Sequence, residues 1–137
     1  MSQSDRGEFE NRDRAKQLIS FQGMKYDSIT PTDMDGLIEY HDECYVLMEF
    51  KYKGKELPYG QKLAFTRLAD DLEKARKPTT LLICNHEVDN PDVDVIAKDA
   101  IVKQYYYKGR WYHGGNRTVK EVTDKFLDYI ELLKLGF

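Results

Sequence analysis

The chain has 137 residues, of which 41% are hydrophobic and 33% are charged, and its formal net charge is −3. This length and composition predict one domain over residues 1–137 with a single substantial core. No run of about 18 apolar residues is present, so we expect neither a membrane span nor a membrane partner. The first residues lack a secretory pattern, and the isolated Cys44 and Cys84 indicate free thiols in a reducing cytoplasm rather than a zinc site or a disulfide.

The first thirty residues predict a helix followed by a short strand. Ser4 or Asp5 can cap the start of the helix, and Gly23 suits the position just after its end. Residues 26–29 then predict a short strand, which is stopped by the sequence Thr-Pro-Thr at residues 30–32.

Residues 37–40 and 45–52 predict a β-hairpin whose second strand is apolar but carries a carboxylate and an amine. Glu49 and Lys51 are two residues apart, so on a strand they point to the same face. Asp35 lies just before the hairpin, which can bring it close to both. A buried charge persists only when it is paired, and two carboxylates beside one ammonium suit a hard divalent cation and an activated water. This arrangement points to phosphodiester hydrolysis.

The rest of the chain predicts a helix, a buried strand, a second hairpin and a last helix. In order, these segments are a helix from Pro58 to Lys77, a strand over 81–84, a hairpin of 101–107 with 110–113, and a helix that begins at Thr118. Thr118 and Glu121 have the spacing of a capping box. The predicted order is therefore α-β-β-β-α-β-β-β-α, which indicates an α/β fold with a mixed sheet flanked by helices.

Asp35, thirteen intervening residues and then Glu49-Phe50-Lys51 resemble the motif of the PD-(D/E)xK nucleases. Among these, the sequence is most similar to the small members that resemble Holliday-junction resolvases, over roughly residues 7–85. Met34 stands where the family's name has proline. The resemblance implies a restriction-endonuclease-like mixed sheet and a nuclease that depends on Mg²⁺ or Mn²⁺.

The resemblance also implies roles for the motif residues. Asp35 and Glu49 would hold the metal together with the backbone carbonyl of Phe50, and Lys51 would position or deprotonate the attacking water. Two alternatives stay open. Glu49 and Lys51 could form an ion pair on a solvent-exposed face, or Asp35 could be a turn residue with Asp33 as the true ligand.

Two more residues extend the resemblance outside the hairpin. Glu10 lies in the predicted first helix, where resolvase-like members place a glutamate, and Gln61 opens the helix that follows the second strand of the hairpin. Glu10 would then reach the metal directly, through water, or at a second ion, and Gln61 would orient the water or a phosphate. Each also has a simpler interpretation, as a solvated side chain of a charged helix and as an ordinary helix-opening residue.

Charge is distributed unevenly along the chain. Residues 26–50 contain seven acidic residues and no Lys or Arg, whereas residues 100–120 contain five basic residues and no acidic one. An acidic pocket beside a basic surface suits a nuclease. The predicted nucleic-acid contacts are Lys53, Lys55, Lys103, Lys108, Arg110, Trp111, Arg117 and Lys120. The aromatic residues of the second hairpin could instead form half of the core.

The leading hypothesis is therefore a metal-dependent DNA nuclease of a structure-selective or resolvase-like kind, which works as a homodimer or is recruited by a partner protein. The alternative is a catalytically silent protein on a nuclease fold. Such a protein would bind nucleic acid or inhibit a partner, for example as a phage or mobile-element inhibitor of host machinery. The complete set of Asp35, Glu49 and Lys51 favours the enzyme.

Overall fold

The computed structural model describes residues 17–136. The chain divides into two units, residues 1–32 and residues 33–137, and each is described by itself. The predicted first helix and Glu10 fall largely or wholly outside the described residues. Residues 17–23 are described and are not helical, so the prediction that the first helix continues to Gly23 is wrong. Leu18 and Ile19 are 94% and 79% exposed, so these residues lack the packing that stabilises a short helix.

The short strand predicted over residues 26–29 is also wrong, because these residues close into a tight turn. The Tyr26 N–H donates to the Ile29 carbonyl at 2.8 Å, and the Ile29 N–H donates back to the Tyr26 carbonyl at 2.9 Å. Asp27, between them, has a positive φ of 57°. The two β-prone residues therefore pair with each other and not with a neighbouring strand.

The second unit is a five-stranded mixed sheet in which the strand order follows the chain order. The strands are β1 (Gly36–Tyr40), β2 (Cys44–Tyr52), β3 (Thr79–His86), β4 (Ile101–Tyr107) and β5 (Arg110–His113). All neighbouring pairs are antiparallel except β2 and β3, which are parallel. The predicted hairpins, the central strand and the α/β class with a mixed sheet are thus confirmed.

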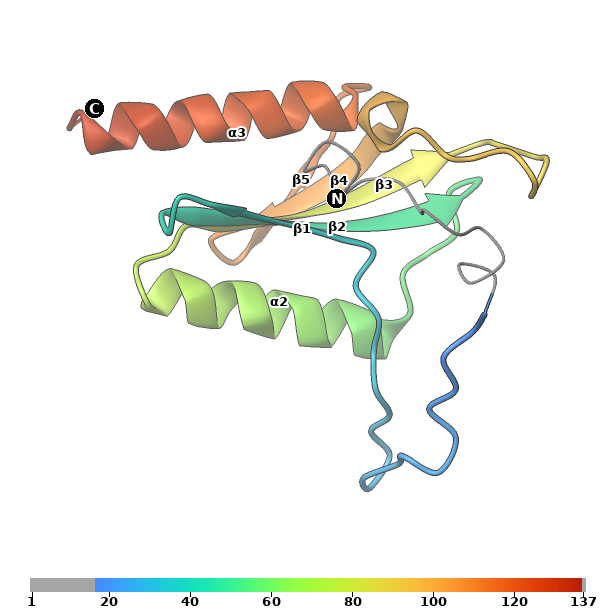
Figure 1. Ribbon diagram of the computed structural model, residues 1–137. Helices are drawn as coiled ribbons and strands as arrows, with labels where there is room; N and C mark the ends of the chain where they lie inside the picture. The colour runs from blue at the N-terminus through green and yellow to red at the C-terminus, as the bar shows by residue number, and fades with distance from the viewer. Residues whose placement is uncertain (1–16, 137) are drawn as a thin grey trace, which may run out of the picture. The chain divides into compact units, whose positions relative to one another are not determined.

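Two helices cover the two faces of this sheet. Helix α2 (Tyr59–Lys74) connects β2 to β3 and packs on one face, and α3 (Val119–Lys134) packs on the other (Figure 1). A short 3₁₀ turn, η2 (Ala97–Asp99), precedes β4. Neither helix described in residues 17–136 has the length and hydrophobicity needed to cross a bilayer.

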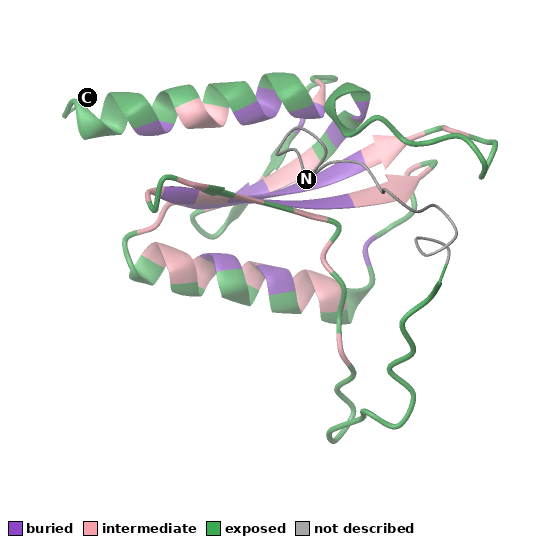
Figure 2. Ribbon diagram, in the orientation of Figure 1, coloured by how far each residue is buried: buried purple, intermediate pink, exposed green. Residues whose placement is uncertain are grey.

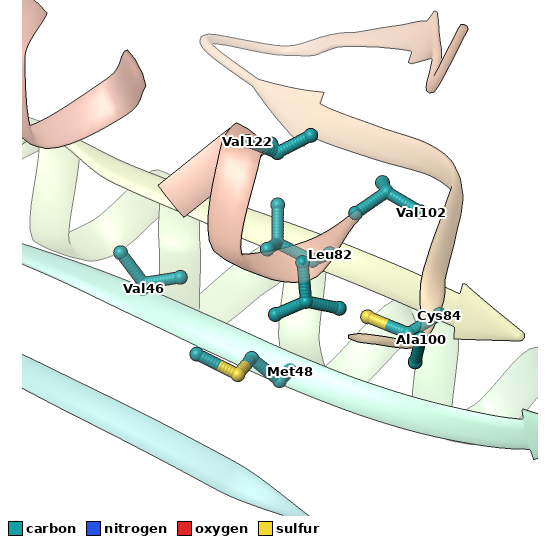
Figure 3. Close-up of a cluster of buried hydrophobic side chains, with 8 residues drawn as sticks. Val46, Met48, Leu82, Cys84, Ala100, Val102 and Val122 are labelled. Atoms are coloured by element: carbon teal, nitrogen blue, oxygen red, sulfur yellow. The ribbon is translucent and has the colours of Figure 1, made fainter. Parts of the chain in front are cut away.

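The central strands are buried on both faces, which Figure 2 shows as the band of buried residues through the sheet. Val46, Leu82 and Val102 point toward α3, where Figure 3 shows them packed with Met48, Cys84, Ala100 and Val122. Leu47 and Leu81, which are sequence neighbours of Val46 and Leu82, point the other way, toward Phe65 and Ala69 of α2. Because side chains alternate along a strand, Glu49 and Lys51 share the α2 face with Leu47.

The start of α3 is fixed by the predicted capping box. The Thr118 hydroxyl accepts the Glu121 N–H at 3.1 Å, and the Glu121 carboxylate accepts the Thr118 N–H at 3.0 Å. The hydrogen bond from the Thr118 backbone holds the pKa of Glu121 below its ordinary value. The residues before α3 are equally constrained, because the Gly114 N–H donates to the Lys103 carbonyl at 3.0 Å.

This close approach generates a test of the path between β5 and α3. A Cβ atom at Gly114 would lie 1.7 Å from the Val102 carbonyl oxygen, so Gly114→Ala should lower the free energy of unfolding by about 3 kcal/mol. Gly60→Ala is the matched control, because a Cβ there meets nothing within 4 Å and alanine favours a helix. Urea denaturation should show the two variants shifting in opposite directions. Wild-type stability of Gly114→Ala would contradict the described path.

Candidate active site

The hairpin of β1 and β2 brings Asp35 and Glu49 together. The pairing of Gly36 with Met48 places Asp35 beside Glu49 at the open end of the hairpin. The Asp35 N–H donates to Glu49 Oε2 at 2.8 Å, and Asp35 Oδ2 accepts the Phe50 N–H, also at 2.8 Å. Each carboxylate therefore binds the backbone of the opposite strand, and the two are held in a reciprocal arrangement.

Glu49 is the most constrained member of the pair. It is only 2% exposed, whereas Asp35 is open to solvent. Burial raises the pKa of Glu49, and the nearby charges of Asp35 and Asp33 raise it further. The hydrogen bond from the Asp35 N–H and the charge of Lys51 oppose this increase. Without a bound cation, the site thus disfavours the ionised form of Glu49.

The burial of Glu49 decides one of the alternatives left open by the sequence. A Glu49–Lys51 ion pair on a solvent-exposed face is wrong, because Glu49 is buried and the ion pairs found among residues 17–136 do not join these two side chains. Asp33 contributes charge near Glu49, but the carboxylate that bonds to β2 is that of Asp35.

Helix α2 places further polar groups at the same end of the sheet. The helix runs back from the end of β2 to the start of β3. Its first turn therefore lies near the C-terminal ends of these two strands, where Lys51 of β2 pairs with Asn85 of β3. Gln61 is half-buried and precedes the sheet-packed Phe65 by four residues, which puts both on the sheet-facing side of the helix. No acidic side chain occupies this first turn, and Pro58 at the N-cap makes no side-chain hydrogen bond. The positive end of the helix dipole therefore remains available to an anion.

Two residues near the pair had no role in the sequence interpretation. Asn85 lies opposite Lys51 in the parallel register, and its side-chain oxygen accepts the Gly54 N–H, which fixes the turn after β2. Cys84 is buried, and its pKa is raised to about 12, first by burial and then by the charges of Asp35 and Glu49. The sequence carried no signal for either, because both depend on the pairing of β2 with β3.

The donor set determines which ions fit. Residues 17–136 contain no group of three or more His, Cys, Asp or Glu side chains arranged to hold a metal. Asp35 and Glu49 offer two carboxylates, which matches the one or two that Mg²⁺ usually takes beside water and phosphate oxygens. A raised pKa of Glu49 is also the expected property of a carboxylate that a cation would neutralise. The residues therefore fit Mg²⁺ or Mn²⁺ and do not match a structural zinc site.

The predicted nucleic-acid contacts separate into two groups along the sheet. Lys53 and Lys55 follow β2, and the Lys103 ammonium donates to the Gly54 carbonyl at 3.1 Å, so these three lie at the carboxylate end. Lys108 and Arg110 flank the turn between β4 and β5, five residues along β4 from Lys103 or roughly 17 Å away. The structure does not bring the two groups together.

Of the remaining predicted contacts, Trp111 and Lys120 have local partners, whereas the Arg117 side chain has none among the described residues. Trp111 is half-buried, its ring lies 5.2 Å from that of Tyr106, and the Lys62 ammonium lies 4.5 Å from the Trp111 ring. Lys120 pairs with Asp124 at 2.8 Å in the first turns of α3, and Arg117 is exposed just before that helix. Tyr106 belongs to the core, so part of the aromatic pattern of this hairpin is structural.

Two adjacent cavities extend from the carboxylate end of the sheet toward β5. One has a volume of about 360 Å³ and is lined by Lys53 and Asn85, and the other has a volume of about 410 Å³ and is lined by Lys62 and Trp111. Both are also lined by Lys103 and His113. The sequence interpretation missed Lys62 and His113, because neither stands in a recognisable motif.

No protein-family model, curated protein or solved structure matches this chain. The resemblance to PD-(D/E)xK nucleases therefore rests on the motif and on the order of elements. Any functional assignment depends on the geometry and chemistry of the site itself.

The raised pKa of Glu49 generates a prediction about stability and pH. Because the pKa in the folded state lies above the ordinary 4.5, Glu49 favours folding at low pH, and this contribution is lost as the pH rises through the folded-state value. Glu49→Gln can still accept the Asp35 N–H, so in a chelator it should be more stable than wild type at neutral pH and gain nothing at low pH. Urea denaturation across this pH range measures the difference.

Glu87→Gln is the control, because Glu87 is exposed and its loss should leave the pH profile unchanged. Adding Mg²⁺ should stabilise wild type and not Glu49→Gln, since only the ionised carboxylate binds the cation. If the free energy of unfolding changed with pH in the same way for wild type and Glu49→Gln, Glu49 would not be held in an unfavourable ionised state.

Proposed function

We propose that this protein is a metal-dependent nuclease that hydrolyses phosphodiester bonds in DNA. The observation that carries the proposal is the buried Glu49 carboxylate, hydrogen-bonded to the backbone of Asp35 and sharing a strand face with Lys51. A buried carboxylate beside a second one raises the free energy of the folded state, and a fold keeps such a pair without penalty when a cation binds there. The restriction-endonuclease-like character of the sheet is part of this proposal.

The protein's own residues would divide the chemistry as follows. Asp35 and Glu49 would hold Mg²⁺ or Mn²⁺, together with the Phe50 carbonyl. When bound, the ion would supply a Lewis acid for the phosphate and lower the pKa of the attacking water. Lys51 would orient that water and offset the negative charge that develops on the phosphate. Gln61, in the first turn of α2, would hold the water or a non-bridging phosphate oxygen.

The adjacent cavities supply a path for the substrate. Lys53, Lys103 and Lys62 place ammonium groups along it, and Trp111 adds an aromatic surface. Two of these lysines are paired with exposed carboxylates, Lys53 with Asp89 at 3.2 Å and Lys103 with Glu56 at 3.3 Å. A phosphate would replace these carboxylates as partner. Phosphates attract such cations without regard to sequence, so this path suits backbone contacts more than base recognition. Lys108 and Arg110, at the other end of β4, would contact only a substrate long enough to cross the sheet.

Cleavage assays test the proposal directly. Linear, single-stranded and four-way-junction DNA should be cut in Mg²⁺ or Mn²⁺ and left intact in EDTA. Asp35→Ala and Glu49→Ala should each lower the cleavage rate by about 100-fold or more, because each removes a metal ligand. Lys51→Arg should lower single-turnover cleavage severely while DNA binding is kept, because a planar guanidinium cannot replace a compact ammonium beside the water.

The matched controls are Asp92→Ala and Lys74→Arg, which alter exposed residues away from the pair. Wild-type protein that cuts none of the substrates but binds them would favour the catalytically silent alternative. Metal-dependent cleavage that survives Glu49→Ala would show that the site lies elsewhere.

The separation of the basic residues generates a prediction about salt dependence. Two double variants each remove two positive charges, from opposite ends of the sheet. The first combines Lys53→Gln with Lys55→Gln, and the second combines Lys108→Gln with Arg110→Gln. For a short duplex, the first double variant should flatten the dependence of log affinity on log salt by about one for each lost phosphate contact. The second should leave the slope near that of wild type. Fluorescence anisotropy over a salt series decides between them, and the reverse pattern would place the duplex at the far end.

A further inference from the structure

A third cavity lies on the α3 face of the sheet, opposite the face that carries Glu49. Its volume is about 220 Å³, and it is lined mainly by residues of β4 and α3. The walls are aromatic, formed by Tyr105 and Tyr107 from the strand and by Phe126 from the helix. None of these residues takes part in the proposed nuclease site, so this cavity raises a separate question.

The aromatic walls are held in place by neighbouring rings. The Tyr107 ring lies 5.7 Å from that of Phe126 and 6.3 Å from that of Tyr129, and both contacts are nearly perpendicular. Tyr105 stacks on Tyr112 of the edge strand β5 at 5.2 Å. Edge-to-face and stacked pairs of this kind fix ring orientation. The cavity is therefore largely formed before anything binds.

A buried polar group lines the same cavity. The hydroxyl oxygen of Tyr107 is buried and has no hydrogen-bond partner among the described residues. Burial is the largest cause of the raised pKa of Tyr107, followed by the charge of Glu73 and by the neighbouring Tyr129. Buried hydroxyl groups are normally satisfied, so a bound molecule that shifts the Tyr107 ring enough to reach this oxygen would complete its hydrogen bonding.

Two cations stand at the mouth of the cavity. Arg117 and Lys125 both line it and are exposed, and neither forms an ion pair or side-chain hydrogen bond within residues 17–136. The charges of both act on Glu121, whose carboxylate is already bound to the Thr118 N–H. Two positive charges thus border an aromatic cavity, and neither is paired with a carboxylate.

We propose that this cavity binds a small anion built on a single aromatic ring, either an aryl phosphate or an aryl carboxylate. The ring would lie against Tyr105, Tyr107 and Phe126, and the anionic group would contact Arg117 and Lys125. The volume supports this size of ligand. An apolar cavity of about 150 Å³ accommodates benzene, and drug-sized ligands occupy about 300–1,000 Å³, so 220 Å³ suits one ring with a short substituent.

Binding of defined probes tests this assignment. Phenyl phosphate and 3-phenylpropionate are titrated into the full chain by isothermal titration calorimetry, with inorganic phosphate and benzyl alcohol as probes that lack one half of the ligand. At least one aryl anion should bind saturably, and about tenfold more tightly than inorganic phosphate or benzyl alcohol. Only the aryl anion contacts both the aromatic rings of the cavity and the cations at its mouth. The aryl anion that binds more tightly identifies the anionic group as phosphate or carboxylate.

Variants connect that binding to the cavity. The double variant Arg117→Gln with Lys125→Gln should weaken binding about tenfold or more, and Tyr107→Phe should weaken it by a smaller factor. Arg67→Gln with Lys74→Gln removes the same charge from the exposed side of α2 and should leave affinity unchanged. The site is also independent of the nuclease proposal, so Glu49→Gln should bind as wild type does. Absence of saturable binding by either aryl anion, or equal affinity in the Arg117/Lys125 double variant, would overturn the assignment.

Discussion

The hydrogen bonds that the Glu49 and Asp35 carboxylates accept from the backbone N–H groups of Asp35 and Phe50 connect the fold of this protein to the proposed chemistry. Each carboxylate accepts an N–H from the opposite strand, so the start of β1 and the end of β2 are joined by the groups that would hold a cation. Glu49 is buried in the process, and its pKa is raised. The interaction therefore orders the site and at the same time disfavours the ionised carboxylate that the proposed chemistry needs.

The apolar core of the sheet offsets the free-energy cost of burying Glu49. β2 and β3 are buried on both faces, with Leu47 and Leu81 against α2 and Val46 and Leu82 against α3. Apolar burial of that extent can offset one unfavourable carboxylate. The crossover through α2 also brings the first turn of a helix, with its unpaired N–H groups, to the end of the sheet where the carboxylates lie. The parallel pair β2 and β3 therefore both positions the site and supplies the apolar burial that stabilises it.

The two faces of the sheet have different character. The α2 face carries carboxylates, ammonium groups and open cavities, which suits a phosphate backbone. The α3 face carries a smaller, aromatic cavity with two cations at its mouth. One scaffold can support two such sites because side chains alternate along β4, so that Gln104 and Tyr106 line one face while Tyr105 and Tyr107 line the other.

The sequence by itself determined the elements of the second unit and the proximity of Asp35 to Glu49. Alternation, turn residues and caps act locally, which is why both hairpins, the central strand and the two helices could be predicted. It failed at residues 26–29, where Tyr26 and Ile29 pair with each other across a tight turn. Only the tertiary structure decided that Glu49 is buried, that Asn85 stands beside Lys51, and that Lys103 and Lys108 lie at opposite ends of β4. Those facts depend on which strands pair and in which direction, and contacts between distant segments leave no periodic signal in the chain.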